Sequence, residues 1–126
     1  MRRFNSILIV EDDREIREAL RDVITLEGYQ AVEAENGKVA LDLLRQGGIA
    51  KEPCLILLDL MMPELNGWEF LELRRKSDAI AAIPTIVLSA VSDSKLPKGA
   101  VKILRKPVNL ISLLEEIEGY CTPTAA

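Results

Sequence analysis

The sequence contains no histidine, and this absence excludes several kinds of chemistry. Histidine is the most frequent general base near neutral pH and a member of the Ser-His-Asp triad. The chain also has no histidine to complete a zinc site with its cysteines or to carry a phosphoryl group. Any chemistry of this protein must therefore depend on carboxylates, hydroxyls and lysine.

Cysteine is scarce as well, since Cys54 and Cys121 are the only two in the chain. They lie far apart in the sequence and form no CxxC motif, so we expect both to be reduced thiols. The apolar stretch near the N-terminus ends at Val10, which makes it too short for a secretory signal or a membrane span. We therefore expect a cytoplasmic protein with no membrane partner.

The sequence also has no excess of basic residues, because 16 lysines and arginines stand against 20 aspartates and glutamates. This balance is not typical of proteins that bind nucleic acid or acidic membrane surfaces. A chain of 126 residues, 48% of them hydrophobic, is long enough for one domain with its own core. We expect a single domain over residues 1–126, with an ordered core over about 5–120 and a disordered tail over 122–126.

Short apolar runs alternate with helical patterns along the chain. Five runs are typical of buried or half-buried strands: 6–10, 29–35, 54–59, 84–90 and 101–105. Helical spacing indicates a helix after each of the first three runs, and the third of these helices, over 67–76, carries Phe70, Leu71 and Arg74 on one face.

The ends of the predicted helices carry capping residues. Either Asp12 or Asp13 caps the first helix, with Glu15 as the reciprocal partner of Asp12, and Gly28 ends it. Asn109 caps the last helix. The predicted inner face of this last helix consists of Leu110, Leu113, Leu114 and Ile117.

Strands separated by helices favour parallel pairing with right-handed crossovers. The sequence therefore predicts an α/β fold, a doubly wound five-stranded parallel sheet covered by helices on both faces. The connection between the fourth and fifth strands departs from the pattern, because residues 91–100 include Pro97 and Gly99. It is too short for a full crossover helix, and we expect at most one helical turn there.

Polar residues stand where these strands end. Sites in open parallel sheets lie beyond the carboxyl ends of the strands, and those positions are held by Glu11, Asp12, Asp59, Ser89 and Lys106. Three carboxylates close together repel one another and favour a hard divalent cation such as Mg²⁺. A cation, a lysine and a hydroxyl suit the oxygens of an incoming phosphoryl group, and Asp59 is then the candidate nucleophile.

Four segments at these strand ends carry a family resemblance: "VEDD" (10–13), "DLMMPELNG" (59–67), "LSA" (88–90) and "KP" (106–107). Each is weak alone, but the four in this order are specific. From Ile7 to about Tyr120, the chain resembles the receiver domain of two-component response regulators. The resemblance implies a flavodoxin-like (βα)5 sandwich, here with a shortened fourth helix.

The resemblance also implies a role for each acidic residue. Asp59 would be the phosphoacceptor, and Glu11 and Asp12 would position Mg²⁺. Asp59 itself and the backbone carbonyl of Met61 would complete the coordination by the protein. Phosphorylation would switch the binding of a downstream protein.

The remaining implied roles belong to Ser89 and Lys106. Ser89 would hydrogen-bond the phosphoryl group and Lys106 would pair with it, and the Lys106–Pro107 bond is often cis in such domains. The implied phosphoryl donor is a histidine kinase or a histidine phosphotransfer protein. Such a domain is not an enzyme, except that it assists its own phosphorylation and dephosphorylation.

Three other functions remain to be weighed. An aspartate-nucleophile phosphohydrolase needs a second aspartate two residues after the first, where this chain has Met61. A flavin-binding module would need a glycine- and hydroxyl-rich loop after the first strand, where "EDD" would repel a phosphate. A receiver-like module that binds partners without phosphorylation stays open, as does the choice between a stand-alone regulator and a part of a larger protein.

Three positions depart from the usual receiver pattern. Ile103 stands where such domains carry an aromatic residue that changes rotamer, so we expect the signal to leave through backbone movement of 89–97. Met61 and Val91 stand beside the path of a hydrolytic water, and neither side chain can orient that water. We therefore expect a long-lived phosphoryl group.

Overall fold

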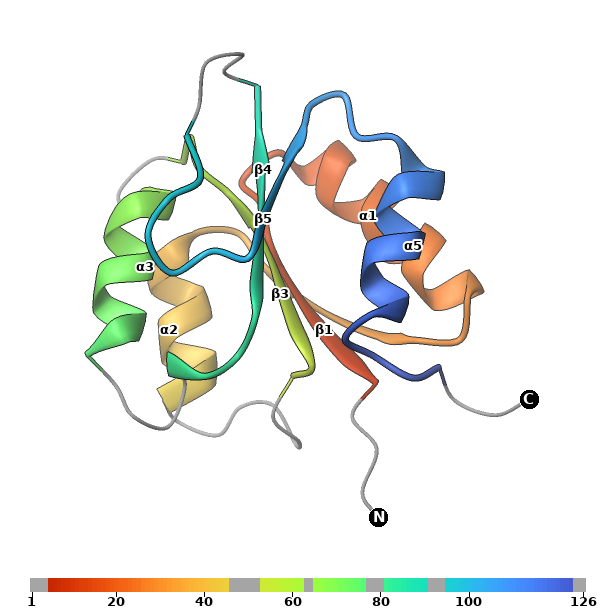
Figure 1. Cartoon of the computed structure of the whole chain (residues 1–126), viewed down its shortest axis with the longest axis horizontal. Coiled ribbons are helices and arrows are strands. Elements are labelled where there is room, and N and C mark those ends of the chain that lie inside the picture. The colour runs from red at the N-terminus through yellow and green to blue at the C-terminus, as the bar shows by residue number, and fades with distance from the viewer. Residues whose placement is uncertain (1–4, 46–52, 63–64, 77–80, 91–94, 124–126) are drawn as a thin grey trace.

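The computed structural model describes residues 5–45, 53–62, 65–76, 81–90 and 95–123. Within these residues the chain forms one sheet of five parallel strands in the order β2-β1-β3-β4-β5 (Figure 1). The strands are β1 (Ser6–Val10), β2 (Gln30–Ala34), β3 (Leu55–Asp59), β4 (Thr85–Ser89) and β5 (Lys102–Arg105). The helices of the described residues are α1 (Arg14–Leu26), α2 (Gly37–Arg45), α3 (Gly67–Arg75) and α5 (Leu110–Glu118).

The helices cover both faces of the sheet, with α1 and α5 on one face and α2 and α3 on the other (Figure 1). Successive residues of a strand point to opposite faces, so β1 and β3 each contribute to two separate cores. Leu8 and Ile56 pack in the core that contains Phe70 of α3, whereas Ile7 and Leu57 pack in the core that contains Ile24 of α1. The predicted doubly wound, flavodoxin-like sandwich is therefore confirmed.

Side-chain caps begin all four described helices, and at α2 Asn36 Oδ1 accepts a hydrogen bond from the Val39 N–H at 2.9 Å. Asp13 caps α1, because its Oδ1 accepts a hydrogen bond from the Ile16 N–H at 3.1 Å. Asn66 and Glu69 form a capping box at the start of α3. Asn109 caps α5 as predicted, accepting from the Ser112 N–H at 3.0 Å. None of the described helices is long and apolar enough to cross a membrane.

The predicted inner face of α5 is partly wrong. Leu113 and Ile117 are fully buried, and Leu114 packs against the same core. Leu110 is 42% exposed, because it is the first residue of α5 and lies beyond the cluster that Leu113 and Ile117 join. Helical spacing gives the face of a residue but not the point along the helix where the core ends.

The connection from β4 to β5 has no helix within its described residues, 95–101. This agrees with the shortened fourth helix that the sequence predicts; residues 91–94 lie outside the described part. A buried arginine of α3 contacts the neighbouring turns, since Arg74 donates hydrogen bonds to the carbonyl oxygens of Ala81 at 2.9 Å and Gly99 at 2.8 Å. Its Nε also lies 3.3 Å from the hydroxyl of Thr85 at the start of β4.

The expectation of two reduced thiols is wrong, because Cys54 and Cys121 form a disulfide. Their Cα atoms are 5.5 Å apart although 67 residues separate them in the sequence. Cys54 precedes β3 and Cys121 follows α5, and both belong to the core between the sheet and α1 and α5. The packing of α5 on this face thus brings the two sulfur atoms together, which the spacing of cysteines could not reveal.

Candidate functional site

The register of the parallel strands places four strand ends at one edge of the sheet. Asp59 of β3 pairs with Leu88 of β4, and Ser89 pairs with Arg105 of β5. The backbone of Glu11 extends the pairing of β1 by one hydrogen bond, from its N–H to the Ala34 carbonyl at 3.1 Å. The residues that the sequence predicts for the site therefore follow adjacent strands.

Three carboxylates meet at this edge. Oxygen atoms of Glu11, Asp12 and Asp59 all lie within 4.8 Å of one another. Glu11 is 1% exposed and Asp59 3% exposed, whereas Asp12 is open to solvent. Two buried carboxylates beside a third need a compensating positive charge. Lys106 supplies part of this positive charge.

Lys106 lies between the two buried carboxylates. Its Nζ is 2.7 Å from Oε1 of Glu11 and 3.2 Å from Oδ1 of Asp59. The Lys106 N–H donates to the carbonyl of Ser89 at 2.8 Å, which fixes the lysine backbone beside the end of β4. The Lys106–Pro107 peptide bond is cis, as the resemblance implied.

The charges of the cluster change the proton affinities of two of its members. Burial is the main cause that raises the pKa of Glu11 to about 7; the hydrogen bond from Lys106 opposes the rise and the neighbouring Asp59 adds to it. Burial alone would lower the pKa of Lys106, but the hydrogen bond and charge of Glu11 and the charge of Asp59 outweigh it and raise the pKa. Lys106 therefore stays charged at neutral pH.

The chain after β3 holds Asp59 in place. Oδ1 of Asp59 accepts a hydrogen bond from the Met61 N–H at 3.3 Å. Gly67 begins α3 directly against this segment and donates its N–H to the Leu60 carbonyl at 2.9 Å. A Cβ on Gly67 would lie 2.7 Å from Cα of Leu60 and 3.0 Å from the Asp59 carbonyl. The glycine that ends the "DLMMPELNG" segment is therefore required for this close approach.

The donor set fits a hard divalent cation. Three carboxylates and one ammonium group leave a local charge of −2 if all four are ionised. Carboxylate oxygens at such spacing are the ligands that Mg²⁺ takes while it keeps several waters. Met61 lies next to the cluster through its backbone amide. Its thioether is a soft ligand, so only its backbone carbonyl suits a hard cation.

Of three other residues that the sequence singles out, the structure describes two, Ser89 and Ile103. Ser89 ends β4 and is fully buried at the same edge of the sheet. Val91 lies outside the described residues. Ile103 is partly buried in the core between the sheet and α2 and α3.

Sequence reasoning missed one residue next to the site, Arg17 of α1. Its Nη1 donates to the backbone carbonyl of Glu11 at 2.8 Å, and its Nε lies 3.1 Å from Glu33 on β2. The position of Arg17, six residues after Glu11, did not indicate a contact between the two residues. Helical spacing does not show which atom the end of a long polar side chain reaches. The "EDD" segment itself was the only pointer to this part of the chain.

Known proteins share both the fold and the sequence pattern. Residues 7–118 match the sequence model of the response regulator receiver domain family. A polar-differentiation response regulator DivK from Brucella anthropi is 31% identical over 120 residues, which span 91% of this chain and 94% of that protein.

Solved structures agree with this match. A response regulator receiver protein from Pseudomonas putida is 29% identical with a TM-score of 0.81, over 94% of this chain and 99% of that one. The receiver domain of a Francisella response regulator is 28% identical with a TM-score of 0.80, over 92% and 95% of the two chains. The chain therefore belongs to the family of response regulator receiver domains, which are phosphoacceptor signalling domains.

Proposed function

We propose that Asp59 is the phosphoacceptor of this receiver domain and that Mg²⁺ binds beside it. One observation carries the proposal: the carboxylates of Glu11, Asp12 and Asp59 meet within 4.8 Å, and the Lys106 ammonium contacts two of them. Glu11 and Asp12, with Asp59 and the Met61 carbonyl, would hold the ion. When bound, Mg²⁺ supplies positive charge to the oxygens of the transferred phosphoryl group.

The residues of the chain then act on the phosphoryl group. A carboxylate oxygen of Asp59 attacks the phosphorus, a phosphorus–oxygen bond forms, and the phosphorus–nitrogen bond of a phosphohistidine donor breaks. Lys106, already 3.2 Å from Asp59, pairs with an oxygen of the transferred group, and Ser89 donates a hydrogen bond to it.

The partners follow from this chemistry. The donor is a histidine kinase or a histidine phosphotransfer protein, and a downstream protein binds according to the phosphorylation state. We place the domain in the cytoplasm and assign the whole of residues 1–126 to it. Phosphohydrolase activity is disfavoured because Met61, in the position of the acid/base of that class, cannot move a proton.

Incubation with a small acyl or amido phosphate, with and without Mg²⁺, tests the proposal. Intact-mass measurement should show one phosphoryl group per chain, formed only with Mg²⁺, and no sustained release of phosphate from an added ester. The Asp12→Asn variant should need more Mg²⁺ but still be modified. Modification at full extent without Mg²⁺, or continued turnover of the ester, would contradict it.

A further inference from the structure

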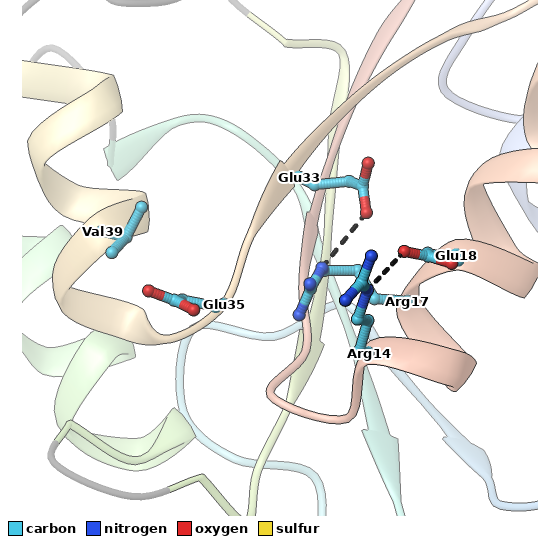
Figure 2. Close-up of a pocket in the computed structure, with 6 residues that line it drawn as sticks. All are labelled: Arg14, Arg17, Glu18, Glu33, Glu35 and Val39. Atoms are coloured by element: carbon cyan, nitrogen blue, oxygen red, sulfur yellow. Dashed lines mark hydrogen bonds and ion pairs between the residues drawn. The ribbon is translucent and has the colours of Figure 1, made fainter.

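Arg17 connects the acidic cluster to the neighbouring strand. Its side chain is 14% exposed and runs from α1 toward β2 and the loop after β1. Figure 2 shows Arg17 facing Glu33, with the Arg14–Glu18 pair beside it. The guanidinium donates through Nε to Glu33 at 3.1 Å and through Nη1 to the Glu11 carbonyl at 2.8 Å.

This second hydrogen bond lies at the base of the cluster. Glu11 and Asp12 are adjacent, so the backbone at Glu11 determines the direction of both carboxylates. The N–H of Glu11 is held by Ala34 at 3.1 Å, and its carboxylate accepts from the Asp13 N–H at 3.2 Å. The Arg17 hydrogen bond fixes the remaining polar group of the Glu11 backbone.

Glu33 makes this arrangement rigid. Arg21, one turn further along α1, also pairs with Glu33, at 3.2 Å. Arg17 itself is bound at two points, the Glu33 carboxylate and the Glu11 carbonyl, and a planar guanidinium bound at two points has little freedom to turn. Arg17 donates to Glu11, whereas Arg21 donates to Glu33 and Asp22, so Arg21 provides a matched control.

The charge of Arg17 and its hydrogen bond to Glu11 should have opposite effects on the affinity of the cluster for a cation. A guanidinium near the acidic cluster repels Mg²⁺, so its removal should tighten binding if charge were its only influence. If Arg17 orients the ligands, its removal should weaken binding instead. The two effects have different signs and can be separated by experiment.

We infer that Arg17 is a positioning residue for the cation site: it fixes the Glu11 backbone and thereby aligns the carboxylates of Glu11 and Asp12. The inference rests on the proposed function, because it takes Mg²⁺ as the ligand of this cluster. Partners behind metal ligands are known to alter metal affinity when they are removed. Arg17 differs from such partners in acting through the backbone of a ligand.

Calorimetric titration of the purified chain with Mg²⁺ tests the inference. Arg17→Ala should weaken Mg²⁺ binding by roughly tenfold. Arg21→Ala, which removes the same charge from the same carboxylate, should bind Mg²⁺ as tightly as the wild type or more tightly. Arg17→Lys, which cannot hold Glu33 and Glu11 at the same time, should fall between Arg17→Ala and the wild type and serves if Arg17→Ala does not fold.

A second measurement needs no metal. The Asp13 amide is hydrogen-bonded to the Glu11 carboxylate, so its hydrogen exchange reports the order of the loop. Exchange at Asp13 should become faster in Arg17→Ala and stay unchanged in Arg21→Ala.

The outcomes separate the two proposals. Equal or tighter Mg²⁺ binding in Arg17→Ala, or equal effects of the two alanine variants, would overturn the positioning role while leaving the cation site intact. Failure of the wild type itself to bind Mg²⁺ would overturn the proposed cation site and the role of Arg17 with it.

Discussion

Different interactions hold the connecting segments on the two faces of the sheet: a disulfide on one face and the hydrogen bonds of a buried arginine on the other. On the face of α1 and α5, the disulfide of Cys54 and Cys121 joins the chain after α5 to the start of β3. On the face of α2 and α3, the described part of the β4–β5 connection has no helix (Figure 1). There Arg74 donates hydrogen bonds to the carbonyl oxygens of Ala81 and Gly99.

The difference separates two kinds of stabilisation. A helix pairs most of its own backbone groups, whereas an irregular segment leaves carbonyl oxygens that need donors from elsewhere. The three hydrogen bonds of Arg74 go to neutral oxygens, and burial lowers the pKa of Arg74. The disulfide acts mainly on the unfolded chain, but the arginine acts only where the folded segment is in place.

The largest expected effect is the loss of stability when the disulfide is removed. Reduction of the disulfide, or the double variant Cys54→Ala, Cys121→Ala, should lower the free energy of unfolding by roughly 4 kcal/mol, because the bond closes a long loop. Urea unfolding of the oxidised and reduced protein measures this difference. Identical unfolding midpoints for the two forms would contradict the proposed contribution of the disulfide.

The second effect is on the arginine side. Arg74→Met should lower the free energy of unfolding by about 2–3 kcal/mol, since it leaves buried oxygens without their donor. Hydrogen exchange should also rise at Ala100 and Val101, whose amides donate within and beside this segment. Arg75→Met, on the exposed face of α3, is the matched control and should change neither quantity. A uniform increase of exchange over the whole sheet would show that Arg74 has no local role.

The third effect concerns the response to phosphorylation. Ser89 ends β4 and Lys106 follows β5, and the Lys106 N–H donates to the Ser89 carbonyl at 2.8 Å, so their movement toward a phosphoryl group should disturb residues 89–106. No aromatic residue stands at position 103 to change rotamer. Hydrogen exchange with and without a beryllium fluoride mimic should therefore change most in this segment and little in α1. A maximal change in α1 or α2 would refute this route.

The smallest effect concerns the lifetime of the phosphoryl group. Met61→Asn should accelerate dephosphorylation by about tenfold at most, because an amide beside Asp59 can orient water but the side chain is largely exposed. Met61→Leu keeps the apolar character and should leave the rate unchanged. Dephosphorylation is followed by intact mass in excess Mg²⁺. Equal rates in the two variants would mean that Met61 does not shield the acyl phosphate.

Much of the fold and the site could be predicted from the sequence, because both depend on where strands end. The short apolar runs located β1, β3 and β4, and parallel pairing then brings Glu11, Asp59 and Ser89 to one edge. The position of Arg74 beside Phe70 and Leu71 on the inner face of α3 was also predictable from helical spacing.

What could not be predicted depends on contacts between distant segments. The disulfide forms because α5 packs beside the start of β3, and nothing in the spacing of the two cysteines shows this. The hydrogen bond from Arg17 to Glu11 depends on the path of a long side chain, which Glu33 on another strand determines. Periodicity gives the direction of a side chain from its helix but not the atom that it reaches.

The site of phosphorylation is the central claim, and its chemical trapping tests it most directly. The chain is phosphorylated with a small donor in Mg²⁺, the acyl phosphate is reduced with borohydride to the alcohol, and the modified peptide is sequenced by mass spectrometry. We predict a single modified position, Asp59, and no modification in Asp59→Asn treated in the same way. Modification at Asp12 or any other residue of the wild type, or full modification of Asp59→Asn, would contradict the assignment of Asp59 as the phosphoacceptor.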